Sequence, residues 1–412
     1  MLRSAIKSKQ LGFLRKSVSS LFMEKKMAHH GLADRLQGTD QNVWVEFGNL
    51  VVKEKALNLG QGFPDFHAPE YVKKALAEAV MSDNPFLNQY TRGYGHPRLV
   101  KALADLYSPL MNHPIDPMNE ILISVGAYGG LFCAVQGLIN PGDEVIIIEP
   151  FFDCYEPMVR VAGGVPVFVP LRRIEKPEDA ERASFQSSEF CLDYEELSSK
   201  FSHKTKAIFF NNPNNPLGKV YSMEECEMIA DLCKKYNTIV FSDEVYEWLI
   251  YDDKKHIKIA NLPGMYDQTL TFSSAGKAFS VTGWKLGWTI GPPHLVKACS
   301  VLHQNCSYTC PTPLQEAIAM AVEREIPKLG SGCKDCYLLK LARELQPKRD
   351  FLAKCLQEVG MKPIIPDGGY FMIADYSGLM NASPEINLGD SNEPKDYQFV
   401  KWMIANKVFL IR

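Results

Sequence analysis

The chain has 412 residues, 46% of them hydrophobic and 23% charged, which is enough to bury one large or two closely associated domains. A formal net charge of -3 argues against a nucleic-acid-binding scaffold, and no uninterrupted apolar run is long enough to span a bilayer. The 11 cysteines are scattered and odd in number, which favours reduced thiols. The close pair Cys333 and Cys336 has no second such pair, so we expect no metal site there.

The first 27 residues differ from the rest of the chain in charge. No acidic residue precedes Glu24, whereas several basic residues alternate with apolar ones: Arg3, Lys7, Lys9, Arg15 and Lys16. A basic, serine-bearing segment that is amphipathic when helical is typical of a mitochondrial transit peptide. We therefore expect a protein of the mitochondrial matrix. The alternative is a disordered basic tail on a cytoplasmic protein.

From Asn119 onwards, short β-rich runs alternate with helical patterns. Strands are predicted at 121–125, 144–148, 165–169, 206–210, 238–241, 269–272 and 285–290, and helices at 131–139 and 222–235. This alternation predicts an α/β fold with a mostly parallel central sheet. We assign that sheet to a large domain over 71–320, and the flanking segments 28–70 and 321–412 to a smaller α/β domain.

Four motifs directly follow predicted strands: 126–130, 211–218, 242–246 and 273–277. Ligands of such sheets bind at the carboxyl ends of the strands, so we expect these motifs to converge on one crevice. The glycine-rich motif, which includes Ala127 and Tyr128, opens a helix whose free amides can hold a phosphate. A glycine turn used only for tight helix packing is the alternative. Phe152, after the next strand, could cover a planar cofactor or belong to the core.

Two charged residues suggest the cofactor's chemistry. Asp243 ends a buried strand, where a carboxylate needs a cationic or proton-donating partner. A protonated pyridine nitrogen fits that need, and a helix N-cap role is the alternative. Lys277 follows another strand among small residues, with Ser274 before it and Lys285 after it. A hydroxyl, an amine nucleophile and a second cation at this spacing suit a Schiff-base lysine beside a phosphate pocket.

These motifs carry a resemblance to a known family. Asn-Asn-Pro-Leu-Gly-Lys at 214–219, Ser-Asp-Glu-Val-Tyr at 242–246 and Ser-Ala-Gly-Lys at 274–277 resemble aspartate-aminotransferase-like enzymes of fold type I, which use pyridoxal phosphate. The segments 59–66, 88–91 and 149–155 resemble, more narrowly, the kynurenine aminotransferase and cysteine-S-conjugate β-lyase family. The resemblance runs from about residue 31 to about residue 403.

The resemblance implies a role for each matching residue. Lys277 is the expected catalytic lysine, which forms the Schiff base with the cofactor and then moves the proton. The other expected cofactor contacts are Tyr90 from a partner subunit, Ala127, Tyr128, Phe152, Asn215, Asp243, Val245, Tyr246, Ser274 and Lys285. The expected substrate contacts are Trp44, Gly60, Gly62, Tyr128, Asn215 and Tyr308.

The family implies transamination of L-kynurenine, glutamine, methionine and aromatic amino acids with a 2-oxo acid, together with β-elimination from cysteine S-conjugates. It also implies a homodimer with shared active sites, and neither nucleic acid nor membrane is an expected partner.

The C-terminal part departs from the family pattern. Family members continue past the segment matching 399–403 with an arginine, in an Arg-Phe-x-Phe context, that clamps the substrate carboxylate. Arg412 stands in no such context, so that role is not transferred to it. The small domain is therefore expected to lack its final elements. An alternative follows: a catalytically impaired chain that binds the cofactor or pairs with full-length subunits.

Overall fold

The computed structural model describes residues 31–39, 43–331, 333–382 and 392–409. Two compact units are separated near Gln41. The first contributes a short 3-10 helix, Asp34–Leu36. The second, from Asn42 onwards, contains everything described below. The predicted transit peptide and Arg412 lie outside the described residues.

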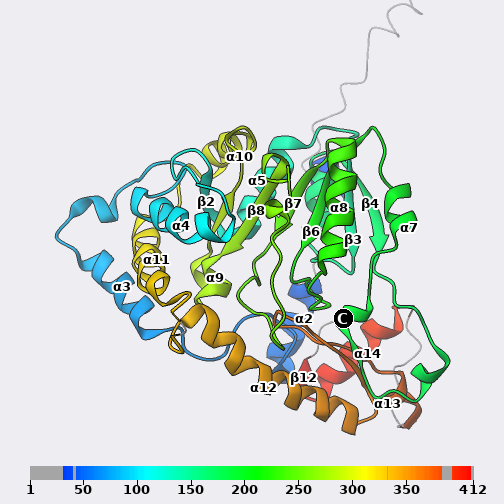
Figure 1. Ribbon diagram of the computed structural model, residues 1–412. Coiled ribbons are helices and arrows are strands. Elements are labelled where there is room, and N and C mark those ends of the chain that lie inside the picture. Colours follow the sequence, from blue (N-terminus) through cyan, green and yellow to red (C-terminus); the bar gives the residue numbers. More distant parts are fainter. Residues whose placement is uncertain (1–30, 40–42, 332, 383–391, 410–412) are drawn as a thin grey trace, which may run out of the picture. The chain divides into compact units, whose positions relative to one another are not determined.

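A seven-stranded sheet forms the centre of the second unit (Figure 1). Its spatial order is β2 (Ile121–Val125), β9 (Leu286–Ile290), β8 (Thr269–Ser274), β7 (Ile239–Asp243), β6 (Thr205–Asn211), β3 (Glu144–Glu149) and β4 (Val165–Pro170). Only β9 runs antiparallel, against both of its neighbours. The predicted α/β fold with a mostly parallel sheet is confirmed.

Several predicted boundaries differ from the structure by one or more residues, and two of the differences have a clear local cause. The strand predicted from Lys285 begins one residue later, because Lys285 has a left-handed backbone with φ 50° and ends a 3-10 turn. The helix predicted from Leu131 begins at Gly126, at the end of β2. Gly126 has a φ of 67°, which glycine adopts without strain and which lets the strand turn directly into the helix. Both corrections concern residues beside the predicted crevice.

The central strands are apolar throughout because both faces of the sheet are covered. Alternate side chains of β3 enter different cores, Val145 and Ile147 on one face and Ile146 and Ile148 on the other. The first face is covered by α5 (Gly126–Leu138), α6 (Tyr155–Val161) and α10 (Pro293–Cys306). The second is covered by α7 (Tyr194–Ser199) and α8 (Met223–Tyr236).

Helix α8 shows how sequence sets these elements. Ser222 and Glu225 form a reciprocal capping box at its start, and Asn237, with a left-handed backbone, ends it. Its apolar residues recur at helical spacing and fill the second core. A third core joins β2 and β9 to α3 (Glu70–Met81), α4 (Pro97–Leu110) and α11 (Thr312–Glu325).

The flanking segments form smaller structures. Strand β1 (Leu57–Asn58) pairs in parallel with β12 (Val408–Phe409), and α2 (Val43–Glu54) packs against α14 (Lys395–Ala405). A three-stranded sheet joins β10 (Lys362–Ile365) to β11 (Ile373–Asp375) and to β5 (Phe185–Gln186). Helices α12 (Tyr337–Glu358) and α13 (Ser377–Ala382) complete this part.

Strand β5 lies within residues 71–320, the range assigned to the large domain. The three-stranded sheet therefore combines strands of the C-terminal flanking segment with one strand from the central part of the chain. The domain boundaries themselves stay a prediction. Among the described helices, none combines the length and the apolar character that crossing a membrane requires.

Candidate active site

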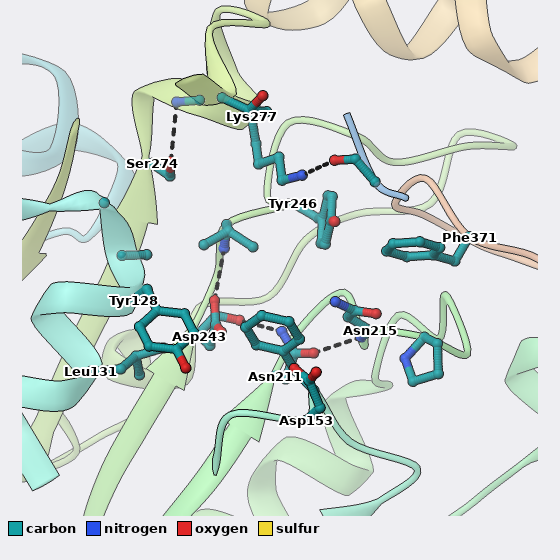
Figure 2. Close-up of a pocket in the computed structure, with 18 of the residues that line it drawn as sticks. Tyr128, Leu131, Asp153, Asn211, Asn215, Asp243, Tyr246, Ser274, Lys277 and Phe371 are labelled. Carbon is teal, nitrogen blue, oxygen red and sulfur yellow. Dashed lines mark hydrogen bonds between the residues drawn. The ribbon is translucent and has the colours of Figure 1, made fainter. Parts of the chain in front are cut away.

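A pocket of about 420 Å³ lies where the strands of the central sheet end (Figure 2). The four motifs that follow β2, β6, β7 and β8 all contribute to its wall, as their positions in the sequence predict. Twelve predicted site residues line it: Trp44, Gly62, Ala127, Tyr128, Phe152, Asn215, Asp243, Val245, Tyr246, Ser274, Lys277 and Lys285. Three others, Tyr90, Gly60 and Tyr308, are not among the lining residues.

Lys277 reaches into this pocket from α9 (Ala275–Ala278), a single turn that follows β8. The hydroxyl of Ser274 accepts a hydrogen bond from the amide of Gly276, which fixes the start of the turn. The Lys277 ammonium donates to the carbonyl of Gly62. Burial, followed by repulsion from Lys285, lowers the pKa of Lys277 to about 8. An amine with this pKa is partly neutral at physiological pH and can act as a nucleophile.

Asp243 is the last residue of β7 and is only 3% exposed. Burial raises the pKa of its carboxyl to about 6, and hydrogen bonds oppose that rise. They come from the hydroxyl of Tyr155 at 2.7 Å and from the amide of Val245 at 3.3 Å. Such a buried carboxylate is suited to holding a cation or a proton donor inside the pocket.

An anion-binding cradle forms at the start of α5. The first amides of a helix have no partner within it, and Ala127 and Tyr128 occupy this first turn at the pocket wall. The ammonium of Lys285 lies 5.6 Å from the centre of the Tyr128 ring, on the same wall. At Gly287 a β-carbon would lie 2.3 Å from the amide nitrogen of Ala127, so glycine is needed for β9 to approach the cradle this closely.

These groups fit pyridoxal phosphate. The cofactor needs an anion site for its phosphate, a carboxylate for its ring nitrogen and an amine for its aldehyde, and one pocket offers all three. Phe152 and Val245 both line that pocket and provide apolar surface for the ring. The role of each residue toward the cofactor stays a prediction.

The asparagine-rich loop after β6 is held by its own side chains. Asn211 donates to the carbonyl of Asp243 at 2.9 Å and accepts from the amide of Asn215 at 2.6 Å. Asn214 donates to the carbonyl of Pro150 at 3.0 Å. The loop is therefore fixed to the ends of two neighbouring strands, and Asn215 lies in the pocket wall beside Tyr246.

A further part of the wall consists of aromatic side chains from the flanking segments. Trp44 and Phe47 enter from α2, and Phe371 precedes β11. At Gly62 a β-carbon would lie 2.6 Å from the Phe371 ring, so this glycine lets the two segments meet. The indole nitrogen of Trp44 donates to Asp153 at 2.5 Å. Gly60, by contrast, is buried behind the wall, where its amide donates to Asn58.

Sequence reasoning missed several lining or supporting residues. Asp153 and Tyr155 lie in a quoted motif, 149–155, but received no role. Asn211 lies in the asparagine run, where a side chain facing the neighbouring strand cannot be distinguished from one facing solvent. Phe47 and Phe371 carry no local signal, because only the tertiary fold brings them to the pocket.

Tyr90 and Tyr308 lie together outside the pocket wall. Their rings meet edge to face with centroids 5.3 Å apart, and they are 81% and 51% exposed. Neither ring belongs to the apolar cores formed by the described residues.

A charged network lies directly behind Asp243. The ammonium of Lys258 lies 2.6 Å from a carboxylate oxygen of Glu244 and 2.6 Å from one of Glu247. Glu244 also accepts from Ser242 and His256, and Glu247 accepts from Ser273 and Tyr107. Since Ser242 precedes Asp243 and Ser273 precedes Ser274, the network joins the two strand ends that carry the site.

Comparison with known proteins agrees with this geometry. The model of the family "Aminotransferase class I and II" matches residues 54–412, and the chain belongs to that family. It is 56% identical over 375 residues to kynurenine–oxoglutarate transaminase 3 of Mus musculus, covering 91% of this chain and 80% of that protein. It is 48% identical over 382 residues to kynurenine–oxoglutarate transaminase 1 of Homo sapiens, covering 92% and 89%.

Solved structures of aminotransferases share the fold. N-succinyldiaminopimelate aminotransferase of Mycobacterium tuberculosis matches with a TM-score of 0.76 at 32% identity, covering 91% of this chain and 99% of that one. A double mutant of Thermus thermophilus aspartate aminotransferase matches with a TM-score of 0.77 at 28% identity, covering 92% and 91%. The predicted aspartate-aminotransferase-like fold is confirmed.

Proposed function

We propose that this chain is a pyridoxal-phosphate-dependent aminotransferase that transfers the amino group of L-kynurenine to a 2-oxo acid, which leads to kynurenic acid. We extend the donors to other large uncharged amino acids, among them glutamine, methionine and the aromatic residues. The observation that carries the proposal is the joint presence of Lys277 and Asp243 in one pocket with an anion cradle. The 56% identity to a kynurenine–oxoglutarate transaminase supports the choice of substrate.

When bound, pyridoxal phosphate supplies an electron sink that stabilises negative charge at the substrate α-carbon. Asp243 would hold a proton on the ring nitrogen, since its buried carboxylate is best stabilised by a positive partner. Lys277, with a pKa lowered to about 8, would remove the proton from the substrate α-carbon and deliver it to the cofactor, using the same amine nitrogen.

The other polar groups would orient the cofactor. Ser274, Lys285 and the first amides of α5 would bind the phosphate, and Lys285 supplies the positive charge. Asn215 and Tyr246 would donate hydrogen bonds to the phenolic oxygen. The ring of Tyr246 lies 5.4 Å from the Lys277 ammonium, so both residues can act on the same edge of the cofactor.

The substrate side of the pocket favours flat apolar side chains. Trp44, Phe47 and Phe371 supply aromatic surface, and such surfaces bind rings with an energy beyond that of simple area burial. β-Elimination from cysteine S-conjugates is proposed as a side activity on the same grounds of family and pocket.

We further propose a homodimer in which Tyr90 completes the phosphate site of the partner subunit and Tyr308 its substrate pocket. The support is that both rings are exposed and lie together while neither lines the pocket of their own chain. Location in the mitochondrial matrix is proposed from the composition of residues 1–27 alone.

A spectral titration tests the proposal. Protein purified with pyridoxal phosphate is expected to show the visible absorption band of the lysine-bound cofactor, and L-kynurenine or glutamine should bleach it. A 2-oxo acid should then restore the band. A band that persists in the presence of every donor would contradict transamination by this chain. Folded protein without any such band would also contradict the binding of pyridoxal phosphate.

A further inference from the structure

The pocket contains one charged side chain that the proposed chemistry does not use. Among the described residues that line it, four are charged: Asp153, Asp243, Lys277 and Lys285. Three of them are assigned to the cofactor. Asp153 is the charged group that remains for the substrate, and it is exposed, which places it at the mouth of the pocket. In Figure 2, Asp153 lies across the pocket from Lys277.

Asp153 connects two separate parts of the pocket wall. It follows β3 in the loop before α6, and its Oδ2 accepts the indole N–H of Trp44 at 2.5 Å. Trp44 comes from α2, 109 residues away in the chain. The bond therefore holds the indole ring across the pocket mouth and places a carboxylate at the edge of that ring.

The charge of Asp153 acts inside the pocket. Burial raises the pKa of Tyr128, and the nearby Cys154 and Asp153 raise it further. Tyr128 also lines the wall, beside Phe152, with ring centroids 6.2 Å apart. A substrate side chain that enters the pocket is exposed to the same negative charge of Asp153 before it reaches the aromatic wall.

We propose that Asp153 is a specificity-determining residue that disfavours amino acids and 2-oxo acids whose side chain ends in a carboxylate. This inference rests on the proposed function and names the residue that would distinguish acidic from neutral substrate side chains. A second negative charge at the pocket mouth is repelled, whereas a neutral ring or amide is not. A neutral side chain with an N–H group also finds an acceptor there.

Two substitutions separate the charge of Asp153 from its hold on Trp44. Asp153→Asn removes the charge and keeps an oxygen that can accept the indole N–H. Trp44→Phe removes the donor and keeps both an aromatic ring and the charge. If Asp153 served only to position Trp44, Asp153→Asn would leave the specificity unchanged, because it still accepts the indole N–H.

The experiment compares the holoenzyme with 2-oxoglutarate and with phenylpyruvate as acceptors, using glutamine as the common donor. We expect Asp153→Asn to raise the ratio of kcat/KM for 2-oxoglutarate over phenylpyruvate about three- to tenfold. Trp44→Phe alters the aromatic wall and so can change the individual rates and this ratio, but it keeps the charge of Asp153 and should keep the dependence of the ratio on salt. Added salt should raise the ratio in the wild type and not in Asp153→Asn, because salt screens an exposed charge.

Binding without turnover supplies an independent readout. Glutarate and 3-phenylpropionate carry no amino or keto group, and their affinities can be compared by calorimetry. Asp153→Asn should tighten glutarate about three- to tenfold relative to 3-phenylpropionate. Unchanged ratios in both assays would overturn the role of Asp153. A holoenzyme that turns over no donor would contradict the proposed function, while the calorimetric ratio would still decide the role of Asp153.

Discussion

The hydroxyl of Tyr155 donates a hydrogen bond of 2.7 Å to Oδ2 of Asp243, and both side chains are almost fully buried. This bond favours the ionised carboxylate against the burial that raises its pKa to about 6. The Tyr155 ring also stacks on Phe209 with centroids 4.2 Å apart, so its position is fixed by packing. The hydroxyl can thus be removed without moving the ring.

Tyr155→Phe should therefore raise the pKa of Asp243 above about 6 and weaken the retention of a positively charged partner. We expect the affinity for pyridoxal phosphate to fall about tenfold at pH 7, the effect of losing one hydrogen bond to a charged group. Fluorescence titration of the apoprotein measures this affinity. The loss should shrink as the pH rises, because the carboxyl is then ionised in both proteins. A pH-independent loss would indicate altered packing instead.

The lowered pKa of Lys277 predicts a pH profile for its amine in the apoprotein. Only the neutral amine is methylated reductively, so the rate at Lys277 should rise with pH around a midpoint near 8. Lys285→Met removes the neighbouring positive charge and should move this midpoint upward. Peptide mass spectrometry measures the rate at each pH. Lys354, whose side chain is 74% exposed, serves as the reference within the same protein. A midpoint that does not move would rule out coupling between the two lysines.

The network behind Asp243 predicts a large loss of stability when its cation is removed. Lys258→Met leaves the buried carboxylates of Glu244 and Glu247 without their shared ammonium, which should cost about 3–5 kcal/mol in the free energy of unfolding. The matched control is Lys101→Met, because Lys101 pairs with Asp105 on the surface and should contribute less than about 1 kcal/mol. Urea unfolding of the two apoproteins measures the difference. Similar losses in both variants would contradict the structural role of the network.

A shared active site predicts complementation between two defective subunits. Lys277→Ala lacks the amine but keeps Tyr90, and Tyr90→Phe lacks one hydroxyl but keeps Lys277. If Tyr90 acts on the partner subunit, a mixed dimer has one site with both groups. Its affinity for pyridoxal phosphate at that site should then equal the wild-type value. Borohydride reduction followed by mass spectrometry identifies which lysine holds the cofactor. If the mixed dimer binds pyridoxal phosphate no more tightly than the Tyr90→Phe dimer does, Tyr90 acts on the site of its own subunit.

The sequence predicted the part of the site that follows the sheet. Strands such as β3 and β7 are recognisable from their apolar runs, and parallel strands end at one edge, so the convergence of Asn215, Asp243 and Lys277 could be expected. The chemistry of two residues then indicated the cofactor: Asp243, a carboxylate at the end of a buried strand, and Lys277, an amine among small residues.

The substrate side could not be predicted in this way. Phe371 reaches the pocket because Gly62 allows a close approach between segments 309 residues apart, a contact with no local pattern. The link from Trp44 to Asp153 likewise depends on how α2 lies against the central sheet. Lys285 adopts a left-handed backbone because it ends the 3-10 turn before β9. The pattern of apolar residues does not show this turn, so it predicts a strand that begins one residue too early.

Phe47 belongs both to the wall of the pocket and to the small core that joins α2 to α14 through Val400 and Ile404. A ring-bearing substrate that packs on Phe47 therefore also restricts the helix pair behind it. A ligand that binds only the folded state stabilises that state. A ligand in this pocket should therefore also stabilise the packing of α2 against α14. Amide hydrogens of α14 should exchange more slowly when the pocket is filled, although α14 itself contributes no residue to the pocket wall.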